Sequence, residues 1–260
     1  MKGKTMEERQ TNYTIGEGFE LPSGGKIYDK PVNPHIELRS MTGRDEMKRL
    51  SPSSTPLKTL ADIIEGCMIE KPAIHVYDMA FGDYEYLLHK ARIISYGDDY
   101  KIELTCPYCG ETISTSIQLS DLALKPFDID KFNGLRTLTL PKSNHVVSLK
   151  FQTPHLTELI DNTAKEYKRR YKTAETSFDL LALLLNTIDY VDGEKLTTTE
   201  MENFINRLPV LDVNKIINTL DELNGMLGID TRFYVDCPKC GNEITSFFRI
   251  GTEFFRPTNI

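Results

Sequence analysis

The chain of 260 residues has no long apolar run and no excess of positive charge. Its longest apolar stretch, residues 180–185, is far shorter than the roughly 20 residues that cross a bilayer. The first twelve residues contain no apolar core of the kind found in a signal peptide. The net charge of −7 disfavours nucleic-acid binding through a basic surface. We therefore expect a protein that folds in a reducing cytoplasm and does not bind membranes, with cysteines serving as metal ligands rather than in disulfides.

Catalytic motifs are also missing. The histidines are scattered and none has the spacing of a metal-ligand pair: His35, His75, His89, His145 and His155. The sequence contains no phosphate-binding loop, no dinucleotide fingerprint and no nucleophile elbow. No constellation of residues would carry a reaction, so the sequence predicts a protein that is not an enzyme.

Four of the five cysteines form two copies of one short motif. The copies read CPYCG and CPKCG, and they supply Cys106, Cys109, Cys237 and Cys240. Each copy places two thiolates on a tight turn that ends in glycine, which is half of a tetrahedral site. Zinc prefers four sulfur ligands in this arrangement, and a closed set leaves no position open for chemistry. The spacing predicts one structural Zn²⁺ shared by the two copies.

Alternating sequences flank both copies. Residues 100–105 and 111–118 surround the first, and residues 231–236 and 242–249 surround the second. Each pair reads as two strands of a β-hairpin with the cysteines at its tip, as in a zinc ribbon. The alternatives are two unrelated pairs, disulfides, or a redox dithiol, although a redox pair normally lies where a strand meets a helix. The fifth cysteine, Cys67, lies on an apolar helical stripe and is interpreted as a small buried hydrophobe.

The predicted fold class is α+β: a mostly helical body with small hairpins and a discontinuous ribbon of four cysteines. Several helices have sequence signals at their starts, including Thr42 with Asp45 as a capping box and Pro56 at a first position. The predicted parts are an extended arm (1–37), an N-terminal helical region (38–98), the two halves of the ribbon (99–118 and 231–250), an inserted helical region with hairpins (119–230) and a C-terminal tail (251–260).

The two termini are predicted to bind partners. The arm is rich in glycine and proline, so it carries few contacts of its own. It nevertheless contains apolar groups that gain by burial. The candidate residues are Leu21, Ile27 and Tyr28 in the arm and Phe254 and Phe255 in the tail. The alternative is that the arm packs on its own body.

Several segments, in a fixed order, resemble the T4-type baseplate protein family of contractile-tailed bacteriophages, which includes hub and hub-assembly proteins. The resemblance covers residues 20–250 and is carried by LPSGGKIY (21–28), IELRSMTGRDE (36–46), LADIIEGC (60–67), the helical segment 82–97 that ends in Ser-Tyr-Gly, the CPYCG motif directly after it, residues 188–193 and 208–212, and the CPKCG motif.

The resemblance implies a non-enzymatic structural or assembly protein of the tail baseplate that contacts other phage tail proteins. It is made in the cytoplasm of the infected host cell, and the resemblance leaves open whether it then stays in the virion baseplate. A different class, a zinc-ribbon nucleic-acid-binding protein, is the alternative. The acidic composition counts against it, as does the scarcity of basic residues near the cysteines, where only Lys101, Lys239 and Arg249 lie close.

Overall fold

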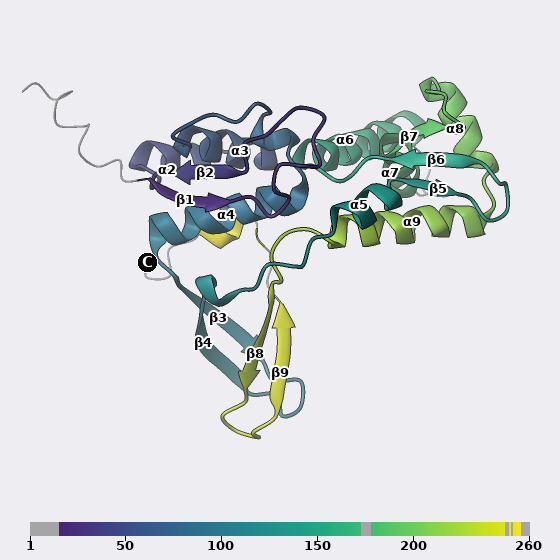
Figure 1. Ribbon diagram of the computed structural model, residues 1–260. Coiled ribbons are helices and arrows are strands. Elements are labelled where there is room, and N and C mark those ends of the chain that lie inside the picture. The colour runs from purple at the N-terminus through teal and green to yellow at the C-terminus, as the bar shows by residue number, and fades with distance from the viewer. Residues whose placement is uncertain (1–15, 173–177, 248–249, 251, 256–260) are drawn as a thin grey trace, which may run out of the picture.

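The computed structural model describes residues 16–172, 178–247, 250 and 252–255. Helices α2 to α9 and small antiparallel sheets make up these residues, which confirms the α+β class (Figure 1). Within these ranges no helix combines the length and the apolar character needed to span a bilayer. Most of the arm's first half and most of the tail lie outside the described residues.

The N-terminal body packs a small sheet against three helices. Its elements are β1 (Glu17–Glu20), β2 (His35–Leu38), α2 (Gly43–Leu50), α3 (Pro56–Cys67), the 3₁₀ turn η1 (Val76–Asp78) and α4 (Phe81–Tyr96). Strands β1 and β2 pair antiparallel, and α4 contributes Leu87 and Leu88, both fully buried, to the core. The predicted capping box is present, because Thr42 accepts from the Asp45 amide while Asp45 accepts from that of Thr42.

The inserted region forms a second body around a three-stranded sheet. Its elements are α5 (Ile129–Leu135), β5 (Thr137–Thr139), β6 (Val146–Leu149), α6 (Pro154–Tyr171), α7 (Phe178–Thr187), β7 (Ile188–Val191), α8 (Thr198–Arg207) and α9 (Val210–Gly225), with strand order β5-β6-β7. Apolar side chains from α7, α8 and α9 cover the sheet and form its core.

Three local interpretations of the sequence of this region are wrong: a plain connector over residues 119–134, Thr199 as the cap of the helix before Pro209, and Asp212 as the cap of the next helix. Helix α5 lies in a segment predicted to be a plain connector; Asp128 caps it. Helix α8 is capped by Thr197, two residues before the expected Thr199. Asp212 does not cap α9: its carboxylate accepts from the amides of Lys142 and Ser143 at 2.8 and 2.9 Å, so it holds the β5–β6 turn instead.

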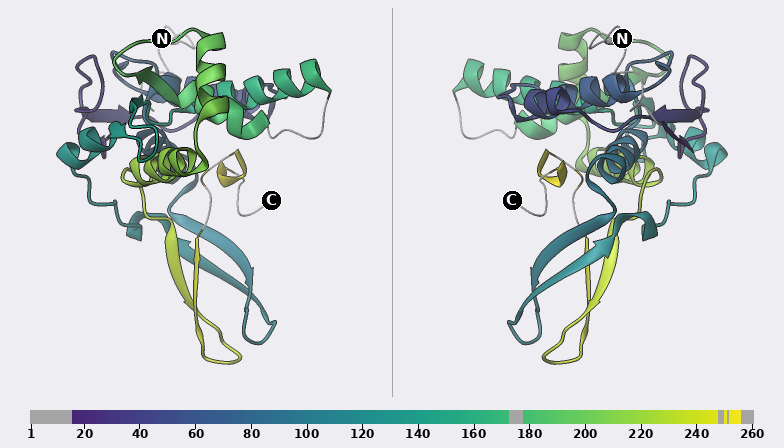
Figure 2. Two further views of the ribbon diagram at one scale, coloured as in Figure 1. Left: turned by 90° about the vertical axis from the view of Figure 1, so that its right-hand side faces the viewer. Right: turned by 90° about the vertical axis from the view of Figure 1, so that its left-hand side faces the viewer.

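Two hairpins project together from the helical bodies, as Figures 1 and 2 show. One consists of β3 (Asp99–Thr105) and β4 (Thr112–Gln118), and the other of β8 (Arg232–Asp236) and β9 (Glu243–Phe247). Each is a separate two-stranded sheet. The sequence predicted both, because alternation of polar and apolar residues is intact on each side of the cysteine turns.

The base of this projection is tied by backbone contacts between distant segments. The amide of Asp230 donates to the Ala123 carbonyl, and the amide of Lys125 donates to the Gly228 carbonyl, both at 2.9 Å. Gly228 in turn lies against Gly82 at the start of α4, where no side chain fits. The chain therefore returns to the N-terminal body just before it enters the second hairpin.

We predict that Gly82→Ala destabilises the fold. A Cβ at Gly82 would lie 2.6 Å from the carbonyl of Leu227, which is backbone and cannot rotate away. We expect a loss of about 1–3 kcal/mol in the free energy of unfolding, measured by chemical denaturation.

Gly66→Ala is the matched control, because it also lies in a helix but has nothing within 4 Å of the added Cβ. This change should leave stability unchanged or raise it by about 0.5–1 kcal/mol. Equal effects of the two substitutions would contradict the close approach of α4 to Leu227.

Candidate metal centre

The four cysteines of the two motifs meet at the tip of the projection. Their Sγ atoms all lie within 4.8 Å of one another. The Sγ atoms of Cys106 and Cys240 are 3.8 Å apart, and those of Cys109 and Cys237 are 3.6 Å apart. A tetrahedral ion bound by four sulfurs at about 2.3 Å requires sulfur–sulfur separations of about 3.8 Å. The cluster can therefore hold one metal ion.

Both cysteine turns have the same backbone geometry. In each, the amide of the glycine donates to the carbonyl of the first cysteine at 2.9 Å. Gly110 and Gly241 adopt φ values of 74° and 71°, in the left-handed region that glycine enters without strain. This turn directs both thiols of a motif to one side, and the hairpins bring the two motifs face to face.

Hydrogen bonds within the cluster shift the pKa values of its thiols in opposite directions, and the neighbouring thiols help to raise the pKa of Cys109 to about 12. Cys106 and Cys237 are buried, whereas Cys240 is exposed. Hydrogen bonds from Asn242 lower the pKa of Cys240 to about 6, and the thiolate is the form that binds metal. All five cysteines lie in the described part of the chain and all are free thiols.

The apolar core of the projection is very small. Cys106, Cys237, Ile113 and Ile244 are its buried members, with Leu104, Val235 and Cys109 partly buried beside them. An ion pair between Lys239 and Glu111 at 2.8 Å joins the two turns across the site. So few apolar groups cannot hold four strands together alone, since small domains of this kind depend on a metal or a disulfide.

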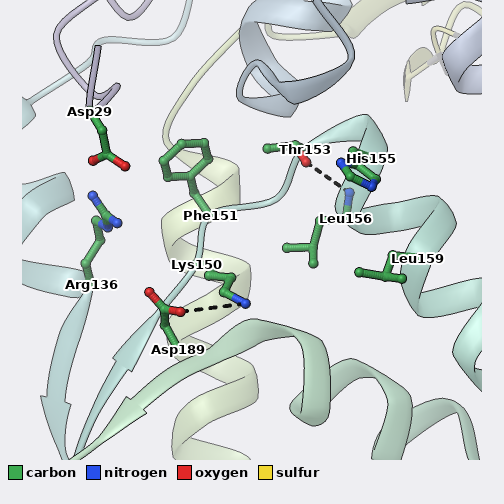
Figure 3. A pocket seen from close by; sticks show the side chains of 9 residues that line it. All are labelled: Asp29, Arg136, Lys150, Phe151, Thr153, His155, Leu156, Leu159 and Asp189. Atoms are coloured by element: carbon green, nitrogen blue, oxygen red, sulfur yellow. Dashed lines mark hydrogen bonds and ion pairs between the residues drawn. The ribbon is translucent and has the colours of Figure 1, made fainter. Parts of the chain in front are cut away.

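A separate cavity of about 330 Å³ lies between the two helical bodies (Figure 3). Its lining mixes charged and apolar groups: Asp29, Arg136, Lys150, Phe151, Thr153, His155, Leu156, Leu159 and Asp189. Most of its polar groups are engaged: Lys150 pairs with Asp189, the Thr153 hydroxyl accepts from the Leu156 amide, His155 bonds to Asp78 and Arg136 lies over the Phe151 ring. These contacts give the cavity walls a structural role.

Comparison with known proteins agrees with the sequence and the fold. A family model described as T4 bacteriophage base plate protein matches residues 15–256, which is nearly the whole chain. The chain belongs to this baseplate family. Comparison with curated proteins and with solved structures gave no significant match.

For this baseplate protein, the structure corrects the prediction that the arm and tail residues contact partners. Leu21 and Ile27 are 3% and 4% exposed, and Phe254 and Phe255 are each 1% exposed. All four pack in the chain's own core, so they are not available to a partner. Burial in the same chain satisfies the apolar groups that motivated the prediction, as the alternative interpretation of the arm proposed.

A buried carboxylate fixes the arm, and it was not singled out in the sequence. Asp83 is fully buried and accepts from the Ser23 amide and hydroxyl at 3.0 and 2.5 Å. The Tyr28 hydroxyl donates to the same carboxylate at 2.6 Å and accepts from the Ala80 amide. Burial and the neighbouring Asp83 raise the pKa of Tyr28 far above its usual range. Tyr28 therefore belongs to an internal network that closes the arm onto α4.

Tail residues are held by a buried arginine. Arg92 on α4 is fully buried, and its Nε donates to the Phe254 carbonyl at 3.2 Å. Its guanidinium also lies over the rings of Tyr96 and Tyr100. Phe254 stacks near His89, and Phe255 contacts Tyr96 edge to face. The aromatic pair of the tail thus completes the core beside the helix that precedes the first hairpin.

We predict that Cys67 reacts slowly with thiol reagents in the native protein. It is fully buried, and burial raises its pKa to about 11, so almost no thiolate exists near neutral pH. Cys67→Ala should leave the metal content unchanged and cost about 1–2 kcal/mol of stability through lost packing. Mass spectrometry of peptides after timed alkylation measures the reaction. Labelling of Cys67 in the native state at the rate of a free thiol would contradict its burial.

Proposed function

We propose that this baseplate-family protein is a non-enzymatic structural or assembly component of a contractile phage tail, acting through contacts with other baseplate proteins. The family match over residues 15–256 is the observation that carries the proposal. Two packed helical bodies and a projecting pair of hairpins provide extended surfaces for such contacts. We place the protein in the host cytoplasm during assembly; whether it then stays in the virion baseplate is decided by mass spectrometry of purified virions.

We further propose that the ion held by the four cysteines is Zn²⁺ and that its role is structural. Cys106, Cys109, Cys237 and Cys240 form an all-sulfur set of the size that zinc requires. Bound zinc would cross-link the two hairpins, and four protein ligands leave it no position for a substrate. Because the surrounding core is so small, metal binding is coupled to the folding of the projection.

Basic groups of the second hairpin do not favour the alternative, nucleic-acid binding. Lys239 is paired with Glu111, and Arg232 makes a bidentate contact with Asp230. These pairs neutralise the cations that would otherwise meet phosphates, and the whole chain carries a net charge of −7. Protein–protein contact is therefore the better supported role.

Metal analysis tests the zinc proposal. Protein purified without chelators should contain about one equivalent of zinc per chain by elemental analysis. Cys237→Ser should release it and lower the melting temperature, because the apparent binding energy of such sites is on the order of 10 kcal/mol. Cys67→Ser is the control, since this cysteine lies outside the cluster. Less than half an equivalent of any metal in fresh protein would overturn the proposal.

The baseplate role is tested in the phage that encodes the chain. Removing the gene should abolish assembled tails while the other tail proteins are still made, and supplying the protein from a plasmid should restore them. Electron microscopy and sedimentation of infected-cell extracts report the result. Mass spectrometry of purified virions then tells whether the protein stays in the particle. Normal tails in the absence of the gene would overturn the proposal.

A further inference from the structure

Helix α2 turns most of its charged side chains toward the protein. Asp45 accepts from Arg39 at 3.0 Å. Glu46 accepts from Arg49 at 2.6 Å and from the Tyr96 hydroxyl at 2.5 Å. The side chain of Arg49 is only 6% exposed. These bonds attach α2 to strand β2 and helix α4 through polar groups.

The apolar side chains of α2 face the opposite way. Met47 is 66% exposed and Leu50 is 67% exposed, and no residue of the helix is buried. A surface helix normally buries its apolar stripe and exposes its charges. In α2 the arrangement is reversed, so the fold of this chain does not account for the apolar face.

Positive charge accompanies this outward face. Arg44 and Lys48 are both exposed, and Arg44 lies one helical turn before both Met47 and Lys48, while both carboxylates of α2 point inward. Within the described residues, the ion pair of Lys48 is a long one, 3.9 Å from Asp62. Arg44 lies in the first turn, where the helix dipole disfavours a cation. The outward face is thus apolar and cationic in a chain whose net charge is −7.

We infer that the face of α2 formed by Arg44, Met47, Lys48 and Leu50 docks into an apolar groove flanked by carboxylates on another baseplate protein. The inference rests on the proposed function, for which it names the contact surface. Charge complementarity identifies the partner's chemistry: two apolar side chains need an apolar pocket, and the two cations beside them need acidic neighbours. Figure 1 shows α2 at the outer end of the N-terminal body, away from the inserted region.

A membrane surface or a second copy fits this face less well. Two turns of helix with two apolar side chains offer little area to insert, and interfacial helices carry longer apolar faces with aromatic residues. A second copy brings the same net charge of −7, which opposes self-association at long range.

Paired variants of α2 test the inference in the phage. Met47→Gln with Leu50→Gln, and separately Arg44→Glu with Lys48→Glu, should each reduce the yield of assembled tails by about tenfold or more. The matched controls are Met47→Leu with Leu50→Met, and Arg44→Lys with Lys48→Arg, which should keep the yield near that of the natural protein. The melting temperature should change little in all four, since every changed side chain is exposed and the gain from Arg44→Glu in the first turn offsets the loss from Lys48→Glu in the last turn.

Carbodiimide treatment of natural baseplates or assembly intermediates identifies the occupant, because it joins a lysine amine directly to a carboxylate that contacts it. We expect mass spectrometry to find Lys48 joined to an Asp or Glu of a different baseplate protein, with apolar residues nearby in that peptide. Lys48 joined only to Asp62, to residues 1–15 of its own chain or to a second copy would overturn the inference.

The controls separate this inference from the proposed function. Wild-type tail yield from both the Met47/Leu50 and the Arg44/Lys48 variants, in a phage that fails without the gene, would overturn the α2 surface and leave the baseplate role intact. Normal tails without the gene would overturn both.

Discussion

The backbone contact between Gly82 and Gly228 is the constraint on which the arrangement of the whole molecule depends. It brings the end of the inserted region against the start of α4, and the amides of Lys125 and Asp230 then bond across the same junction. Through these bonds, the chain that leaves β4 lies beside the chain that enters β8. The end of the first hairpin and the start of the second are next to each other for this reason.

The two hairpins that leave this junction contact each other again at the tip of the projection. Each hairpin has its own pair of strands, and no ladder joins β3–β4 to β8–β9 in the described residues. The hairpins meet instead through the four cysteines and the ion pair between Lys239 and Glu111. Backbone contacts at the base and the cysteine cluster at the tip therefore act at the two ends of the same structure. A metal ion there would set the distance between the hairpins, with few apolar contacts to share the task.

The arm and the tail are also held by contacts with helix α4. Ser23 and Tyr28 bond to the buried Asp83, one position after Gly82, so the arm is anchored at the same end of α4 as the junction. At the other end of α4, Arg92 holds the Phe254 carbonyl. Helix α4 thus connects the arm, the junction and the tail. What remains outward is one face of helix α2: Asp45, Glu46 and Arg49 bond within the fold, whereas Met47 and Leu50 stay exposed.

The sequence by itself determined the secondary structure around local signals and the residues of the metal centre. The capping box at Thr42 and the cysteine turns are read from neighbours in sequence, because their hydrogen bonds close within a few residues. Spacing also indicated that the two cysteine motifs meet, although the predicted domain boundaries stay predictions.

Tertiary structure alone decided the roles of Asp212, Asp83 and the terminal aromatic residues. Their partners lie far away in the chain, and apolar character such as that of Leu21 or Phe254 fits a core and an interface equally well until the packing is known. The outward face of α2 is the converse case: its composition suggests an ordinary buried stripe, and only the bonds of Glu46 and Asp45 to distant groups show which side faces solvent.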